Sequence, residues 1–429
     1  MLNLIGVIIA FIIIIILIRL KVNFGLSLII GSFVVILFSL TNIELIKILE
    51  AFGKALIYDF DKKVYDFQTI ELSFLLTLIY ILAKTMQETG AINKMIKSLR
   101  SIFYKGGTLG VIPAVYGLMP VPGGALFSAP LIDKEGEKYK LKQSQKNFLN
   151  VWFRHIWFPI FPVSSAMMLI ISTDFANIDI YEIIIADFPA FIAFIIIGLI
   201  FLKIYIKKIP KPKTKPKKEY SGLKFLIPPI LPIIIYIVFL SIFTAIGIEN
   251  IKDFQRSIFI LGVVISILSL YFLINIDWKK YITILKQSLS LNLAFAIIGI
   301  MVFRQMIEVS ESNEIISSII GGLPFHPILI VIIVPLIMGL ITGYNFGAIA
   351  LSYFLVEPFF EFTGINIIGF TSLIFISSLV GYLISPIHLC NVVSSDYLKT
   401  DTTRMYKMYI PAVALLLIVQ TSVVLLFYR

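Results

Sequence analysis

The sequence has few charged residues and almost no cysteine. Asp, Glu, Lys and Arg together make up 14% of the 429 residues, and Cys390 is the single cysteine. One cysteine excludes an internal disulfide framework and a cluster of metal-bound thiolates, so we expect Cys390 to be a core-packing residue. Neither an HExxH helix nor a GxxxxGK[ST] phosphate loop occurs. We therefore expect no nucleotide-driven pump, no zinc protease, no bound cofactor and no enzymatic activity.

Apolar runs dominate what is present. Hydrophobic residues make up 59% of the chain, and the mean hydropathy is +0.98. Runs of about 18–25 apolar residues between short charged stretches are typical of a polytopic α-helical membrane protein. The first run, 2–18, has neither a basic leading region nor a small-residue cleavage site, so we interpret it as a retained span. The net charge of +11 comes from loop lysines and reports orientation, not nucleic-acid binding.

The predicted fold class is an all-α polytopic membrane protein. Ten runs are predicted full spans: 2–18, 24–41, 69–87, 147–173, 182–203, 222–246, 256–275, 283–303, 366–395 and 408–427. Two further apolar stretches, 106–132 and 327–356, do not fit simply. Each is either one straight helix or a hairpin that enters the membrane and returns to the same side.

Charge distinguishes the two alternatives. The stretch 203–218, KIYIKKIPKPKTKPKK, is cytoplasmic by the positive-inside rule. With two hairpins and the N-terminus outside, the cytoplasmic loops hold 27 Lys and Arg residues and the outer side holds 8. A straight helix in place of either hairpin moves basic residues to the outside. We therefore predict two hairpins in a multi-pass protein of the cytoplasmic (cell) membrane, with both termini outside and the lysine-rich loop cytoplasmic.

The lysine-rich stretch also divides the chain into two similar halves. We predict repeat 1 over 1–206, a linker over 207–221 and repeat 2 over 222–429. Segments 83–99 and 303–319 align without a gap and share five residues, and each follows the third span of its half. The charges give the halves opposite orientations. Two inverted repeats, each of five spans and a hairpin, are typical of secondary transporters with a substrate site near the membrane midplane.

Three motifs carry a resemblance to a known family: MPVPGGALFSAPLID (119–133), GLITGYNFGAIALSYFLVEP (339–358) and SPIHLCNVVSSDYL (385–398). With them the chain resembles an uncharacterised prokaryotic membrane family, domain of unknown function 401, of the ion-transporter superfamily. That superfamily includes gluconate permeases and divalent-anion/sodium symporters. The resemblance implies a homodimer in which a transport domain around the two hairpins moves against a scaffold, in elevator-type alternating access. The Ser-Asn-Thr motif of the divalent-anion symporters is absent, so the resemblance does not carry over a dicarboxylate substrate or sodium coupling.

The first candidate substrate-binding residues lie at the hairpin tips. Proline and glycine expose backbone groups there, half-helix N-termini favour anions, and free carbonyls favour Na⁺. The predicted residues are Pro120, Pro122, Gly123, Gly124, Ser128, Thr342, Gly343 and Asn345. A coupling Na⁺ on the backbone near Gly123 and Gly343 is one option. The alternatives are that the tips only shape turns, that Ser128 bonds its own helix, and that the second tip bonds neighbouring helices.

Each hairpin is followed by a span that proline interrupts. The candidates there are Ser164, Ser165, Ser385, His388 and Asn391, of which the last three recur on about one helix face. His388 either takes a coupling proton, because imidazole changes charge near neutral pH, or is a neutral hydrogen-bonding residue between helices.

Arg154 lies about eight residues inside a predicted span. A cation about 10–12 Å deep usually faces a cavity or a partner, so Arg154 is our candidate counter-charge for an anionic substrate. Snorkelling to the cytoplasmic surface is the alternative. On a helix His155 points about 100° away from Arg154, so we expect at most one of them to face the site.

Three acidic residues near span ends carry weaker expectations. Glu88 and Glu308 are expected to pair with Lys84 and Arg304 at i, i+4 spacing and not to bind a ligand. Asp187, about a turn from the outer surface, receives no assignment from the sequence.

Together these features predict a secondary active transporter that moves a small organic anion, a carboxylate or sugar acid, coupled to H⁺ or Na⁺. The alternatives are an ion channel, a transporter of a non-carboxylate solute, and a membrane-embedded enzyme built on Ser128 and His388. The expected partners are the anionic solute, the lipid bilayer and a second copy of the chain, with no nucleic acid.

Overall fold

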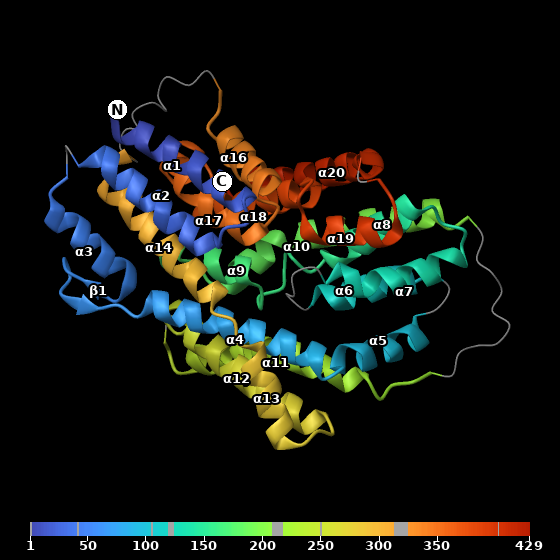
Figure 1. Ribbon diagram of the computed structural model, residues 1–429. Helices are drawn as coiled ribbons and strands as arrows, with labels where there is room; N and C mark the ends of the chain where they lie inside the picture. The colour runs from blue at the N-terminus through green and yellow to red at the C-terminus, as the bar shows by residue number, and fades with distance from the viewer. Residues whose placement is uncertain are drawn as a thin grey trace.

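The structure is a computed structural model that describes residues 2–40, 43–103, 106–118, 124–207, 218–248, 251–312, 325–401 and 403–429. The described residues are mostly helical (Figure 1). Their strands are β1 (Tyr58–Asp59) and β2 (Val64–Tyr65), which pair antiparallel. The prediction of an all-α polytopic fold is confirmed apart from this small hairpin.

The helices of the first half begin with three pieces before the β-hairpin and continue to the lysine-rich stretch. They are α1 (Leu2–Arg19), α2 (Phe24–Ser39), α3 (Leu45–Leu56), α4 (Gln68–Glu88), α5 (Ala91–Ile102), α6 (Thr108–Gly117), α7 (Ala125–Glu137), α8 (Gln143–Arg154), α9 (Ser165–Ile170) and α10 (Ile180–Tyr205).

The described helices of the second half follow a similar series of lengths. They are η1 (Leu223–Leu226), α11 (Ile227–Ala245), η2 (Ile251–Asp253), α12 (Gln255–Leu273), α13 (Trp278–Ser288), α14 (Asn292–Val309), α16 (Ile328–Thr342), α17 (Asn345–Val356), η3 (Glu357–Phe362), α18 (Ile367–Ile384), α19 (Leu389–Leu398) and α20 (Thr403–Phe427).

Eight helical segments of the described residues are long and apolar enough to cross a membrane. They are Leu2–Arg19, Gln68–Glu88, Ile180–Tyr205, Leu223–Ala245, Gln255–Leu273, Trp278–Val309, Ile367–Leu398 and Thr403–Phe427. Each overlaps one of the ten predicted spans. The other two predicted spans are α2, which is apolar but has 16 residues, and the pair α8 and α9. This pattern is that of a multi-pass membrane protein.

Two predicted spans are interrupted as the prolines indicate. α8 ends at Arg154 and α9 begins only at Ser165, and Pro159 and Pro162 lie between them. The second interruption separates α18 from α19 around Pro386. Proline lacks the backbone N–H that a helix interior needs, which explains why neither helix continues.

The predicted span over 283–303 is misplaced. The chain forms α13 first, an amphipathic helix that begins where the Asp277 side chain accepts the backbone N–H of Lys279 at 2.9 Å. Leu289 is extended and ends this helix, and the apolar helix α14 starts at Asn292. Hydropathy alone does not separate α13 from α14, because the residues around the break are also apolar.

The first doubtful stretch, 106–132, is two short helices that pack against each other, α6 and α7 (Figure 1). The chain also returns to where it started. Arg100 Nη2 of α5, before the stretch, lies 3.9 Å from Glu135 Oε2 near the end of α7. A straight helix over 106–132 is therefore excluded.

The second doubtful stretch, 327–356, is likewise two packed helices, α16 and α17. Gly343 makes the turn between them in the left-handed backbone region, with φ of +59°. Glycine adopts this conformation without the Cβ clash that other residues meet. A straight helix is excluded here as well.

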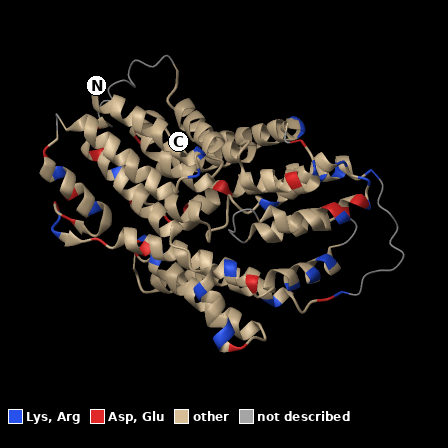
Figure 2. Cartoon of the chain, viewed as in Figure 1, with Lys and Arg blue, Asp and Glu red and all other residues tan. Residues whose placement is uncertain are grey.

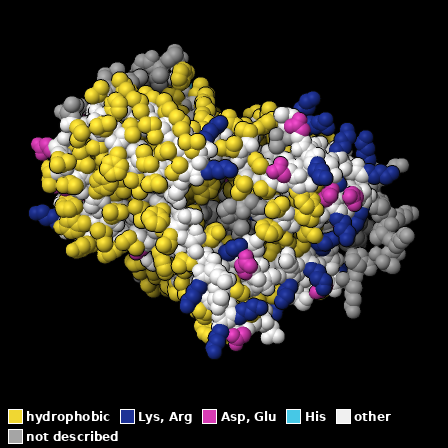
Figure 3. All heavy atoms as spheres, in the orientation of Figure 1, with side chains coloured by type: hydrophobic (Ala, Val, Ile, Leu, Met, Phe, Trp, Pro, Cys, Tyr) yellow, Lys and Arg dark blue, Asp and Glu magenta, His cyan; other side chains and the backbone are white. Residues whose placement is uncertain are grey.

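Hydrophobic side chains cover much of one face of the molecule (Figure 3). On α1, for example, Ile5, Ile8, Ile12 and Ile16 are each about half exposed and share one helix side. The apolar windows of α11 and α20 are only 28% buried, whereas that of α18 and α19 is 83% buried. Exposed apolar area of this extent is typical of a lipid-facing surface, and α18 lies in the centre of the fold.

Basic residues gather at one end of the molecule, over α5 and the loop between α7 and α8 (Figure 2). The segment that follows the lysine-rich stretch reaches the same end, because Lys97 Nζ lies 3.1 Å from Glu219 Oε2. α3 and the β-hairpin lie at the opposite end of α4 (Figure 1). Among the described residues, α5, the loop between α7 and α8, and the segment around Glu219 thus share one end, as the two-hairpin arrangement requires.

Candidate functional site

The two helix breaks meet in the interior. α8 ends at Arg154 and α18 at Ile384, and the breaks that follow carry His155 and His388. The two imidazole rings lie edge to face with centroids 4.9 Å apart, and the Tyr382 ring contacts both, at 5.3 and 3.9 Å. The name central site is used below for the breaks and the adjoining hairpin ends: residues 116–118, 124–128, 154–163, 342–345 and 382–391.

Arg154 packs against both ends of the first hairpin. It is 4% exposed, and its Nη1 donates to the Tyr116 carbonyl oxygen at 2.9 Å. A Cβ on Gly124 would lie 2.2 Å from Arg154 Nη2, and a Cβ on Gly117 would lie 1.9 Å from the Arg154 carbonyl oxygen. Only glycine leaves room for these contacts. Because the guanidinium is buried against the hairpin, the snorkelling alternative is wrong.

His155 and Arg154 both belong to the central site, although we expected at most one of them there. The 100° separation holds only within a regular helix. His155 is the C-cap of α8, with φ of −101° and ψ of 4°, and so has already left the helix. Its side chain contacts His388 while Arg154 contacts the hairpin.

The first tip is described only in part. Pro120, Pro122 and Gly123, and with them the proposed backbone Na⁺ position near Gly123, lie outside the described residues. Gly124 is described and contacts Arg154 as above.

Ser128, on the return arm of the first hairpin, connects three helices. Its Oγ donates to Asn150 Oδ1 at 2.6 Å, and Asn150 Nδ2 donates to Ser394 Oγ at 2.8 Å. Ser128 Oγ also lies 3.2 Å from the Ala125 carbonyl oxygen, a bond within its own helix. Ser128 therefore belongs to a buried polar contact between α7, α8 and α19, with its own-helix bond in addition.

Asn391 makes a similar contact one turn away. Asn147 Nδ2 donates to Asn391 Oδ1 at 3.3 Å and to Ser395 Oγ at 2.7 Å. Sequence reasoning missed both Asn147 and Asn150. The signal was present, because two asparagines three residues apart in an apolar run mark one helix face that needs polar partners.

The second hairpin turn is packed against the second break. A Cβ on Gly343 would lie 3.0 Å from the Ile387 carbonyl carbon and 3.1 Å from the His388 nitrogen. Ser385 Oγ donates to the Leu340 carbonyl oxygen of α16 at 2.7 Å. Thr342 Oγ1 donates to the Met338 carbonyl oxygen at 2.7 Å, a bond within its own helix and not the bond to a neighbouring helix that the alternative predicted.

Asn345, at the start of α17, keeps unused hydrogen-bonding capacity. Its Oδ1 accepts from Ser378 Oγ at 2.9 Å, while its buried Nδ2 has no partner among the described residues. A buried amide donor without a partner is costly, so Asn345 is the residue of the second turn best suited to bind a ligand.

No contact among the described residues places Ser164 or Ser165 in the central site. Ser164 is the N-cap of α9, and its Oγ accepts the Met167 backbone N–H at 3.2 Å. This explains Ser164 without a ligand. Ser165 is the first residue of α9 and is half-buried.

The chemistry of the central site is that of a buried cation among neutral polar groups. Its described residues include Arg154 and two histidines but neither Asp nor Glu. It is therefore suited to an anion.

A second polar cluster lies between α10, α18 and α20. Ser372 Oγ donates to Asp187 Oδ1 at 2.7 Å, and Gln420 Nε2 donates to Ser372 Oγ at 2.6 Å and to the Ala186 carbonyl oxygen at 2.8 Å. Asp187 has no solvent exposure, although the sequence places it near a span end.

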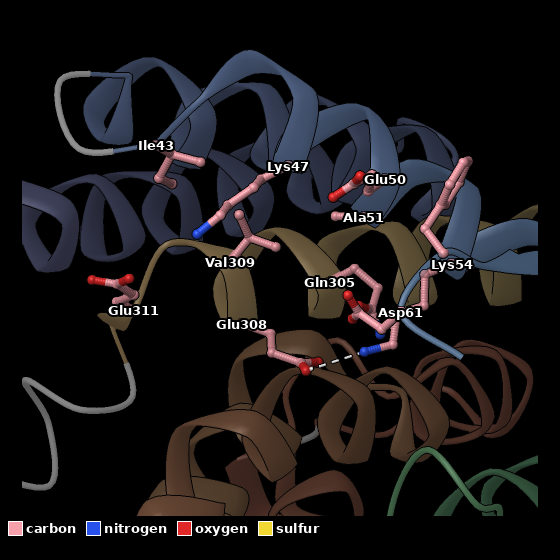
Figure 4. Close-up of a pocket in the computed structure, with 11 residues that line it drawn as sticks. Ile43, Lys47, Glu50, Ala51, Lys54, Asp61, Gln305, Glu308, Val309 and Glu311 are labelled. Atoms are coloured by element: carbon pink, nitrogen blue, oxygen red, sulfur yellow. Dashed lines mark hydrogen bonds and ion pairs between the residues drawn. The ribbon is translucent and has the colours of Figure 1, made fainter. Parts of the chain in front are cut away.

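A separate cavity of about 300 Å³ opens between α3 and α14 (Figure 4). Charged side chains of both signs line it, among them Lys47, Glu50, Lys54, Asp61 and Glu308. Across it, Lys54 Nζ lies 3.4 Å from Glu308 Oε1. The lining includes two lysines and four acidic residues, so its formal charge is negative, and it contains none of the predicted site residues.

Of the two expected i, i+4 ion pairs, one forms and the other does not. Lys84 Nζ lies 2.8 Å from Glu88 Oε1, as the i, i+4 spacing predicts. Glu308 instead pairs with Lys54, and Arg304 Nη1 lies 2.8 Å from Asp174 Oδ1. Tertiary neighbours replaced the local partner in this case.

The sequence matches a family model described as Protein of unknown function (DUF401) over residues 3–427, and the chain belongs to this family. The match includes both hairpins and both helix breaks, so the central site is part of the family's domain. No curated protein matches the sequence.

Proposed function

We propose that this member of the family is a secondary active transporter that moves a small organic anion, a carboxylate or sugar acid, coupled to H⁺ or Na⁺. The observation that carries the proposal is the meeting of two helix breaks and two hairpin ends around the buried Arg154. Interrupted helices that meet at mid-depth are the usual construction of transporter substrate sites.

The packing of the helices supports an inverted repeat. α1 packs on α2 as α11 packs on α12, and α4 packs on α12 as α14 packs on α2. Both arms of each hairpin pack on the first half of the following broken helix: α6 and α7 on α8, α16 and α17 on α18. The return arms then exchange partners, because α7 packs on α19 and α17 packs on α9. Such an exchange is expected when a two-fold axis relates the halves.

The anion would lie beside both Arg154 and the start of α7. Gly124 is the N-cap of α7 and contacts the guanidinium, so the unpaired N–H groups of that helix begin beside the cation. A helix N-terminus and a cation together favour a carboxylate. In this proposal Asn345 and Asn391 contribute from the second half.

The proposal includes elevator-type alternating access in a homodimer of the ion-transporter superfamily, located in the cell membrane. The hairpins with the two broken helices would form the moving domain, and α1–α4 with α11–α14 would form the scaffold. Its support is that the two groups correspond to separate packing layers in the contacts above.

Uptake into proteoliposomes tests the transport function. The purified chain is reconstituted and offered radiolabelled monocarboxylates, sugar acids and dicarboxylates under an imposed H⁺ or Na⁺ gradient. We expect gradient-driven accumulation of one class, and no unitary conductance in planar bilayers. Accumulation of no solute under any gradient contradicts the proposal, and single-channel steps would identify a channel.

Arg154→Gln tests the site. We expect it to raise KM for the anion by about 100-fold or more, because one charge-assisted hydrogen-bond pair contributes roughly 1.5–3 kcal/mol and the buried site adds to this. The matched control is Arg256→Gln, another buried arginine, which donates to the Gln68 carbonyl oxygen and Thr173 Oγ1 outside the central site. Equal effects of the two substitutions on KM would remove Arg154 from the site.

A further inference from the structure

Three side chains that bind transition metals meet in the central site. His155, His388 and Cys390 each offer a ligand atom, and these atoms all lie within 4.8 Å of one another. All three residues are buried. The chain has one cysteine and three histidines, so its sulfur-and-imidazole donors are concentrated almost entirely at this point.

The hydrogen bonds of His155 leave one nitrogen available for a metal. Its Nδ1 lies 2.7 Å from the Val151 carbonyl oxygen, which can only accept, so Nδ1 carries the proton. Nε2 is therefore the unprotonated nitrogen of the neutral ring, and it accepts a hydrogen bond from Tyr382 Oη at 3.2 Å that a metal ion would displace. A backbone carbonyl on the far ring nitrogen is the arrangement that orients metal-binding histidines.

His388 provides an independent indication. It has no solvent exposure, yet neither ring nitrogen has a hydrogen-bond partner among the described residues. Burying a polar group without a partner is costly, and a bound ion would remove this cost.

We propose that His155, His388 and Cys390 bind one soft transition-metal ion, and that the site prefers Cu(I) to Zn(II). This inference goes beyond the proposed transport of an anion and does not depend on it. The ligand atoms must close from 4.8 Å to about 3.5 Å, the separation of two ligands with tetrahedral bonds of roughly 2.0–2.3 Å. The proposal therefore requires the Cys390 and His388 side chains to rotate so that the ligand atoms approach by up to about 1.3 Å.

The net charge of the metal complex is the reason for the preference for Cu(I) over Zn(II). A thiolate and two neutral imidazoles carry one negative charge, so the complex with Cu(I) is neutral and the complex with Zn(II) is positive. Arg154 directly precedes His155 in the chain and is buried in the same site. A positive complex beside this buried cation is unfavourable, and thiolate and imidazole ligands suit Cu(I).

Metal binding is measured on the full chain, purified in detergent without a polyhistidine tag. Cu(I) is supplied anaerobically with a competing chelator, and the metal content of the protein is counted. We expect about one Cu(I) per chain and an X-ray absorption spectrum with one sulfur neighbour. Cys390→Ser and His388→Ala should each weaken binding by at least about 100-fold, more than the loss of an outer-shell residue causes. His326→Ala, the exposed histidine, is the matched control and should bind as the unaltered chain does.

Each other outcome counts against the proposal. Binding that survives Cys390→Ser places the metal elsewhere, and Zn(II) bound as tightly as Cu(I) removes the charge argument. If a variant does not fold, the spectrum of the unaltered chain still decides, because a copper shell without sulfur excludes Cys390. Absence of any bound copper overturns the site altogether.

Discussion

The His155 and His388 rings lie 4.9 Å apart, although the residues come from helix breaks in different halves of the chain. Each follows the end of a helix in its own half, at the C-cap of α8 and at the N-cap of α19. The contact holds the two breaks together. A substitution in one half of the central site should therefore also change the packing of the other half. The predictions below test the contacts that hold this arrangement.

Gly124→Ala should destabilise the protein by about 1–3 kcal/mol, the usual cost of overpacking. The added Cβ would lie 2.2 Å from Arg154 Nη2 and 2.6 Å from Arg154 Cζ, which the Tyr116 hydrogen bond holds in place. The measurement is the thermal unfolding midpoint in detergent. In the Arg154→Lys background the planar group is gone, so Gly124→Ala should cost clearly less. Equal costs in the two backgrounds would contradict the contact.

Gly343→Ala should cost more than Gly364→Ala. Both glycines have positive φ, +59° and +67°, so both substitutions carry the left-handed penalty of about 1–2 kcal/mol. A Cβ at position 343 would also lie 2.7 Å from Ile387 Cγ1, whereas nothing lies within 4 Å at position 364. The difference in unfolding free energy between the two variants therefore measures how tightly the second turn packs on the second break. Equal costs would mean that the turn and the break are not in contact.

Much of this arrangement could be predicted from the sequence. The prolines predict both helix breaks from local sequence, and the distribution of lysine and arginine over all loops predicts both hairpins. The site contacts were less predictable. The 100° angle between neighbouring helical residues argues against His155, but this angle does not apply beyond the helix, which ends at the His155 C-cap. Cys390 is predicted to be a core residue because burial looks the same for a packing residue and for a ligand. Only the tertiary fold, which places position 155 beside 388 and 390, makes these residues a cluster.

Asn150→Ala should destabilise the contact between α7, α8 and α19 by about 1–3 kcal/mol, because Ser128 and Ser394 would both lose a buried partner. Asn292→Ala is the control, since Asn292 is exposed and its Oδ1 accepts a hydrogen bond from Asn23 Nδ2 at 3.4 Å at the surface. The thermal unfolding midpoint should fall for the first variant and stay nearly constant for the second. If both variants unfold at the same temperature, the buried network does not stabilise the fold.

Asp187→Ala should destabilise the α10, α18 and α20 contact by about 1–3 kcal/mol, because Ser372 Oγ would lose its acceptor in a buried place. Asp187→Asn keeps the shape and an acceptor oxygen, so it should restore most of the loss. The ratio of folded protein in detergent extracts and the unfolding midpoint measure both variants. An asparagine variant as unstable as the alanine variant would show that the carboxyl group itself is required.

Thiol labelling in intact cells should place the two ends of α4 on opposite sides of the membrane. The chain with Cys390→Ser has no cysteine, so one exposed lysine at a time is replaced: Lys62→Cys beside the β-hairpin, Lys97→Cys in α5 and Lys140→Cys after α7. A membrane-impermeant reagent should label Lys62→Cys directly, and the other two only after permeabilisation, because Lys97 and Lys140 lie at the basic end of the molecule, which the positive-inside rule places in the cytoplasm. Lys97→Cys and Lys140→Cys must behave alike, since Arg100 and Glu135 hold the two ends of the first hairpin together at 3.9 Å. Labelling of one of these two from outside and the other from inside would mean that 106–132 crosses the membrane, and the hairpin and the site built on it would both be wrong.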